Sequence, residues 1–108
     1  PPFNLDANMD CQRDNTTTVG CFLAGDYRAN EQLALLAMHN LWIRQHNRLI
    51  DKLQIINPHW SSEQLYQEVR KIVAAQMQII TFEHWLPYIL GPSGMKKLGK
   101  YQKYNEDI

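Results

Sequence analysis

The sequence predicts an all-α fold that forms a segment of a larger, mainly helical domain. Three observations support this prediction. Apolar residues recur at helical spacing over two long stretches, no stretch alternates like a strand, and the first stretch is apolar around more than half its circumference. A chain of 108 residues holds one ordinary domain at most, so it offers few partners to cover such a helix. Residues 1–25 are expected to form an irregular loop, because they are rich in Asn, Asp, Thr, Pro and Gly without a sustained period.

The first predicted helix spans residues 27–56. Its apolar stripe advances in steps of three or four through Leu35, Met38, Trp42, His46, Leu49, Leu53 and Ile56. The helix should end before Asn57-Pro58, because a residue that precedes proline disfavours the α region.

Further helices are predicted over residues 61–90. Ser61 and Gln64 have the spacing of a capping box, which indicates a helix start. Pro87 should kink or break the stretch, and Gly91-Pro92 should end it. The basic tail, residues 94–108, has room for one more short turn.

Composition excludes several classes of function. Eleven basic and eleven acidic residues give a formal net charge of zero, which argues against a general nucleic-acid binder. No apolar run reaches the roughly 18 residues of a membrane span. The first residues also lack the basic flank and apolar core of a signal peptide.

No metal site is expected from the histidines. His39 and His46 lie seven residues apart and therefore on one helix face, but no zinc-binding motif surrounds them. His46 falls within the apolar stripe, so a buried structural histidine is the better interpretation.

The N-terminal loop carries two features of secreted proteins. Cys11 and Cys21 lie ten positions apart in a turn-rich segment, which favours a local disulfide over two unrelated thiols of a cytosolic protein. Between them, Asn15-Thr16-Thr17 matches the N-glycosylation acceptor pattern. Both features predict an oxidising, secretory environment.

Arg28 and Glu31 are three residues apart at the predicted helix start, and they should project from the same side of its first turn. Spacing alone favours an ordinary surface ion pair between them.

A resemblance to a known family favours a functional interpretation of these two residues over a surface ion pair. The run CFLAGDYRANE, followed by MHNLWIRQHNRL, resembles the animal haem peroxidase family, and the resemblance covers nearly the whole chain. Later matching segments are NPHW, LYQEVRKIV, QMQIITFEHWLPYILG and GMKKLGKYQKYN. The resemblance implies part of a secreted catalytic domain that uses hydrogen peroxide to oxidise a halide, a pseudohalide or an organic donor. Bromide oxidation in matrix cross-linking is the narrowest function that it implies. The alternative is a non-catalytic, peroxidase-like helical module that binds extracellular partners.

The resemblance also implies roles for individual residues. Arg28 falls on the arginine of the family's G-D-x-R motif, which lies above the haem iron and stabilises charge as peroxide splits. Glu31 falls on the glutamate that forms an ester with a methyl of a b-type haem. Cys11 and Cys21 match a family loop disulfide.

The chain departs from the family pattern at several points. Gln32 replaces a methionine that some members bond to haem through sulfur, so that bond is not expected. Gln45 replaces a frequent glutamate and should alter a structural hydrogen bond. The family's W-G-Q-x-x-x-H-D segment, which supplies the distal histidine, a second ester carboxylate and a calcium ligand, has no match in this sequence. The proximal histidine that binds the iron also has no match. The resemblance therefore implies that the remainder of the domain, including its calcium site, lies on other chains or other sequence.

Overall fold

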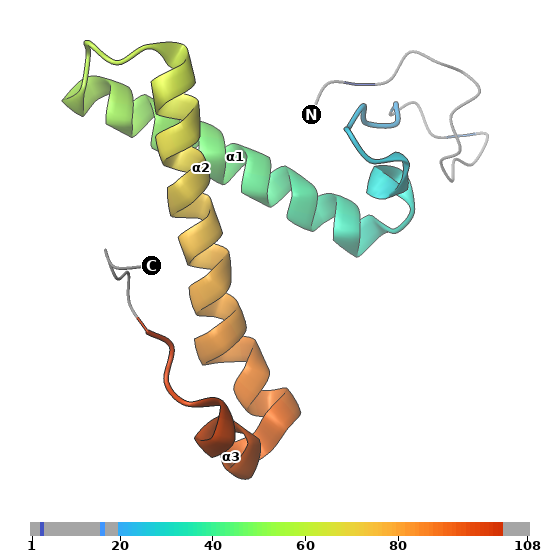
Figure 1. The fold of residues 1–108 in the computed structure, drawn as a ribbon. Helices are drawn as coiled ribbons and strands as arrows, with labels where there is room; N and C mark the ends of the chain where they lie inside the picture. Colours follow the sequence, from blue (N-terminus) through green and yellow to red (C-terminus); the bar gives the residue numbers. More distant parts are fainter. Residues whose placement is uncertain (1–2, 4–15, 17–19, 103–108) are drawn as a thin grey trace. The chain divides into compact units, whose positions relative to one another are not determined.

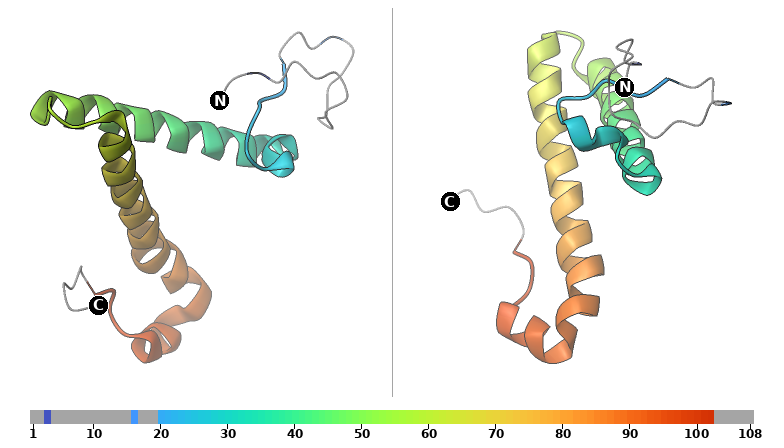
Figure 2. Two further views of the ribbon diagram at one scale, coloured as in Figure 1. Left: turned by 45° about the horizontal axis from the view of Figure 1, so that its top comes forward. Right: turned by 90° about the vertical axis from the view of Figure 1, so that its right-hand side faces the viewer.

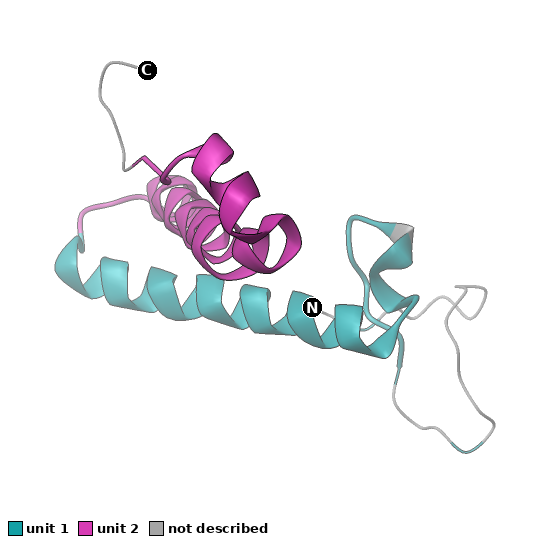
Figure 3. Cartoon of the chain, turned by 90° about the horizontal axis from the view of Figure 1, so that it is seen from below, with its two compact units in different colours: residues 1–58 teal, residues 59–108 magenta. Residues whose placement is uncertain are grey.

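The computed structural model describes residues 3, 16 and 20–102. Every regular element in the described part is a helix, and the one β-type contact there is an isolated antiparallel bridge between Phe3 and Phe22, so the predicted all-α fold is confirmed. The elements follow in the order η1 (Tyr27–Asn30), α1 (Leu33–Ile56), α2 (Ser62–Ile79), η2 (Ile80–Trp85) and α3 (Leu86–Leu98). Figure 1 labels the three α-helices. The chain divides into two compact units, residues 1–58 and 59–108 (Figure 3).

The long helix of the first unit ends where the sequence predicts. The last residue of α1 is Ile56, and the N–H of Asn57 donates to the carbonyl oxygen of Leu53 at 2.8 Å. Pro58 follows directly, so the helix stops at the residue whose α conformation a proline disfavours.

The start of that helix differs from the prediction of one helix over residues 27–56. A short 3₁₀ turn, η1, comes first, and α1 begins only at Leu33. Gln32 separates them because its backbone is extended, with φ −145° and ψ 135°. Its side-chain Oε1 accepts a hydrogen bond from the N–H of Leu35 at 2.9 Å, so Gln32 caps α1.

The second unit begins with the predicted capping box. The Ser61 hydroxyl accepts from the N–H of Gln64 at 3.2 Å, and the Gln64 side chain accepts from the N–H of Ser61 at 2.9 Å. Leu65 and Val69, four residues apart on α2, are buried. After α2 the chain turns back through η2 and α3, as both views of Figure 2 show.

The predicted break near Pro87 takes the form of a π-helical turn. The N–H of Leu86 donates to the carbonyl of Thr81, five residues earlier, and Pro87 has no N–H to continue an α-helical ladder. At Gly91 the backbone leaves the helix, with φ 62° and ψ 179°, and Pro92 starts a last helical stretch that ends before Gly99. The basic tail thus contains the extra turn for which the sequence left room.

Few side chains in the described part are buried. Those below a tenth exposed are Cys21, Ala29, Leu65 and Val69. Large apolar side chains lie on the surface of α1, α2 and α3, among them Leu33, Ile55, Ile56, Tyr66, Tyr88 and Ile89. No helix within the described ranges is long and apolar enough to cross a membrane.

Candidate active site

The residues singled out from the sequence lie on and beside η1, and Asp26 starts this turn. Asp26 has extended backbone angles, φ −125° and ψ 130°, and its Oδ1 accepts from the N–H of Arg28 at 2.8 Å. The turn is closed by backbone hydrogen bonds from Ala29 to Asp26 at 3.2 Å and from Glu31 to Arg28 at 3.1 Å. Aspartate suits this position because its short side chain reaches the first free N–H groups of a helical turn.

Asn30 anchors the turn to the preceding segment. Its Oδ1 accepts from the N–H of Phe22 at 2.9 Å, and its Nδ2 donates to the Phe22 carbonyl at 2.8 Å. The ring of Phe22 stacks on Phe3, with centroids 5.1 Å apart. Gly20 permits this stack, because a Cβ there would lie 3.2 Å from the Phe3 ring. One amide side chain and one aromatic pair therefore hold η1 in place.

The guanidinium of Arg28 is held by Asp26 through two parallel contacts. Nε donates to Oδ1 at 3.0 Å and Nη2 donates to Oδ2 at 2.7 Å. The two side chains are 65% and 50% exposed. The Arg28 side chain is the main reason that the pKa of Asp26 lies far below its ordinary value, followed by the backbone hydrogen bond and, last, by the charge of His39. In turn Asp26 raises the pKa of Arg28, so both groups are charged across the physiological range.

Glu31 follows directly after the turn, and its side chain is exposed. Its carboxylate forms no hydrogen bond or ion pair with any residue that the structure describes. The surface ion pair between Arg28 and Glu31 that spacing alone favours is therefore absent, because Asp26 takes that place. Sequence reasoning missed Asp26 and Asn30. The signal for Asp26 was available, since aspartate two residues before Arg28 stands at a favoured N-cap position.

The two glutamines that depart from the family pattern both have structural partners. Gln32 caps α1, as described above. Gln45 Oε1 accepts from Nε of Arg48 at 3.0 Å and from its Nη2 at 2.8 Å, so one amide oxygen receives both N–H groups. The altered hydrogen bond expected at Gln45 stays a prediction.

The structure describes only one of the three N-terminal residues singled out from the sequence, Cys21. Cys21 is buried, and the described part of the chain contains no free cysteine. Cys11 and Asn15 lie outside the described residues, so their pairing and glycosylation stay predictions. Across residues 20–102, no group of three or more His, Cys, Asp or Glu side chains could hold a metal ion.

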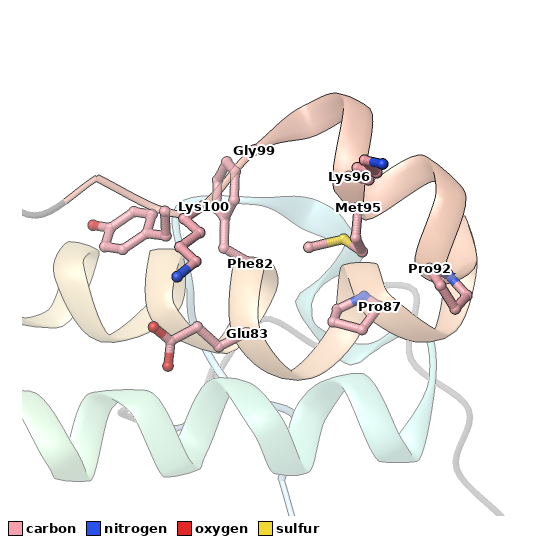
Figure 4. Close-up of a pocket in the computed structure, with 9 residues that line it drawn as sticks. Phe82, Glu83, Pro87, Pro92, Met95, Lys96, Gly99 and Lys100 are labelled. Carbon is pink, nitrogen blue, oxygen red and sulfur yellow. The ribbon is translucent and has the colours of Figure 1, made fainter.

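A separate pocket of about 710 Å³ lies in the second unit (Figure 4). Phe82, Pro87 and Met95 give it an apolar lining, and the lysines at 96 and 100 and the glutamate at 83 add charge. The Tyr101 ring packs against Phe82 with centroids 5.3 Å apart, and its hydroxyl donates to Gln78 Oε1 at 2.9 Å. None of the site residues expected from the sequence lines this pocket.

Comparison with known proteins places these observations in a family. The family described as "Animal haem peroxidase" matches residues 1–108. Peroxidasin of Drosophila melanogaster is 56% identical over 101 residues, which cover 93% of this chain and 7% of that protein. The peroxidasin homolog of Homo sapiens is 52% identical over 108 residues, covering 99% of this chain and 7% of that protein. Myeloperoxidase of Mus musculus is 47% identical over 109 residues, which cover 99% of this chain and 15% of that protein.

The sequence itself points to the peroxidasins through residues 29–35 and the run His84-Trp85-Leu86-Pro87, and this likeness is confirmed by the peroxidasin matches. The chain spans 7–15% of the relatives named here, so the greater part of each relative has no counterpart in it.

Proposed function

Because the chain belongs to the animal haem peroxidase family, we propose that its η1 turn supplies part of the haem site of a peroxidase that uses hydrogen peroxide to oxidise small donors. The observation that carries this proposal is geometric. The charged guanidinium of Arg28, within the anchored η1 turn, and the carboxylate of Glu31, directly after it, are both exposed.

The side chains present suit a haem edge. A carboxylate such as Glu31 can anchor the macrocycle as an ester, and an exposed guanidinium such as Arg28 can face the peroxide-binding side. Neither group is an axial ligand, because haem iron takes His, Cys, Met or Tyr in that role. Axial ligands, the distal histidine and the calcium site are therefore assigned to the remainder of the domain.

Arg28 contributes electrostatics to the reaction. When bound, the haem supplies the redox chemistry that cleaves the O–O bond. Negative charge then develops on the leaving oxygen, and a fixed guanidinium stabilises that charge without giving up a proton. Asp26 accepts hydrogen bonds from one edge of the guanidinium, which sets the direction in which the group is presented.

The donor is proposed from the likeness to peroxidasin, and the compartment is proposed from the sequence of the N-terminal loop. Likeness to peroxidasin favours a halide, with bromide oxidation in matrix cross-linking as the specific candidate. The paired cysteine positions 11 and 21 and the acceptor Asn15 support a secreted or secretory-pathway protein. The second candidate function remains a helical module that binds extracellular partners without catalysis.

The test uses the full-length protein that contains this segment. We expect a Soret band, and we expect Arg28→Ala to slow the reaction with hydrogen peroxide by roughly 100-fold or more while haem content is unchanged. Arg44→Ala, an exposed arginine of α1, is the matched control and should behave as wild type. A protein without haem in any assembly supports the binding module. Wild-type peroxide kinetics in Arg28→Ala shows that Arg28 is misassigned.

A further inference from the structure

We propose that Asp26 is the positioning residue of this site and that it orients the guanidinium of Arg28 for the peroxide step. The inference rests on the proposed function of Arg28 and gives a role to the aspartate of the G-D-x-R motif, to which the sequence analysis assigned none. Its basis is the set of three hydrogen bonds that one carboxylate accepts from Arg28.

The carboxylate performs two tasks at once. Asp26 Oδ1 accepts from the backbone N–H of Arg28 at 2.8 Å and from its Nε at 3.0 Å, while Oδ2 accepts from Nη2 at 2.7 Å. The first contact caps η1, and the other two fix the plane of the guanidinium relative to that turn. A two-point contact sets orientation, which a single hydrogen bond or a point charge does not.

This arrangement is better explained by orientation than by stability. Both side chains are at least half exposed, and exposed ion pairs contribute little to folding. Within reach of a reacting group, a displacement of about 1 Å can cost roughly 100-fold in rate.

The charge state of the pair supports the same conclusion. The hydrogen bonds from the Arg28 side chain and backbone hold the pKa of Asp26 well below its ordinary value. The carboxylate is therefore ionised over the whole pH range in which a peroxidase would act, and it accepts both contacts throughout.

Asp26→Asn separates the two tasks in the full-length protein. Asparagine caps helices as well as aspartate does, so the turn stays capped, but its Nδ2 cannot accept from Nη2. We expect the bimolecular rate of reaction with hydrogen peroxide to fall about 10-fold to 100-fold. The donor-oxidation step and the haem content should be unchanged. Asp51→Asn, at an exposed aspartate of α1, makes the same change in net charge and should have no effect.

A double-mutant cycle decides whether Asp26 acts through Arg28. In the Arg28→Ala background, Asp26→Asn should cause no further loss of the peroxide rate. A further loss in that background, or a wild-type rate for Asp26→Asn alone, overturns the inference. A wild-type rate for Arg28→Ala overturns the proposed function instead, so the two failures are distinguishable.

Crystal structures of the full-length wild type and the Asp26→Asn variant give a readout that does not depend on activity. In the wild type the guanidinium should lie within hydrogen-bond distance of both carboxylate oxygens of Asp26. In the variant it should be displaced or occupy more than one conformation. A guanidinium that keeps its wild-type position in the variant shows that Asp26 does not position it.

Discussion

Replacing Asn30 with alanine removes both hydrogen bonds that tie η1 to the backbone of Phe22, at 2.9 and 2.8 Å. Each intramolecular hydrogen bond contributes about 1 kcal/mol net, and the part-buried Phe22 N–H and carbonyl would lose their partners. The two bonds together give about 2 kcal/mol of local stability. Because η1 contains Arg28 and Glu31 follows it directly, opening of the turn displaces both candidate site residues.

Amide hydrogen exchange in the full-length protein measures this loss. The N–H groups of Ala29 and Glu31 are suitable reporters, since each bonds to a carbonyl of the turn and neither bonds to the Asn30 side chain. A change of about 2 kcal/mol corresponds to roughly 30-fold faster exchange through local opening, because each 1.4 kcal/mol is a factor of ten.

Asn40→Ala is the matched control for that experiment. Asn40 also bonds from its side chain to a backbone carbonyl, that of Leu36 at 3.1 Å, but within α1. Alanine is a strong helix former and offsets part of the loss, so the control should leave exchange in η1 unchanged. Equal exchange rates at Ala29 and Glu31 in wild type and Asn30→Ala would refute the anchoring role of Asn30.

Two further changes test the covalent features expected of the site. Glu31→Gln removes the carboxylate proposed to form the haem ester, so acidified acetone should extract more haem from the variant than from wild type; equal extraction contradicts the ester. Reduction of the predicted Cys11–Cys21 bond should increase exchange and proteolysis within residues 11–21, whereas mass spectrometry that finds both thiols free in the native protein shows that the bond does not exist.

The helix boundaries that the sequence predicts correctly depend on local chemistry. Pro58 ends α1 through its effect on the preceding residue, and Ser61 with Gln64 starts α2 through reciprocal side-chain hydrogen bonds. Each signal acts over three residues or fewer. A local signal can be recognised without knowing the fold.

The start of α1 could not be predicted in the same way. Glutamine is not among the favoured N-cap residues, so nothing marks Gln32 as the point where helix geometry stops and resumes. The wrong helix start also led to a wrong expectation for Arg28 and Glu31. If both residues stood on one α-helical turn, an ion pair between them would be favoured. With a 3₁₀ turn and an extended Asp26, the nearer carboxylate is two residues earlier.

The chemistry proposed for the site was accessible only through the family likeness. A guanidinium and a carboxylate three residues apart are common on surfaces, and nothing in composition or spacing indicates haem. The pocket in the second unit was also not predicted, because its lining depends on the backbone of Gly91 (φ 62°) and Gly99 (φ 85°). The sequence marks such glycines as breaks but does not give the direction in which the chain continues.

The long helices and the η1 turn are stabilised by different interactions. The long helices expose large apolar side chains, including Leu33 at 80% and Tyr88 at 88%, and these surfaces are suited to packing against the remainder of a peroxidase domain. The η1 turn instead depends on hydrogen bonds between residues at most eight positions apart. Its geometry is therefore specified locally. Under the proposed function, the orientation of Arg28 is set within its own turn, which lowers the cost of ordering it in a haem site.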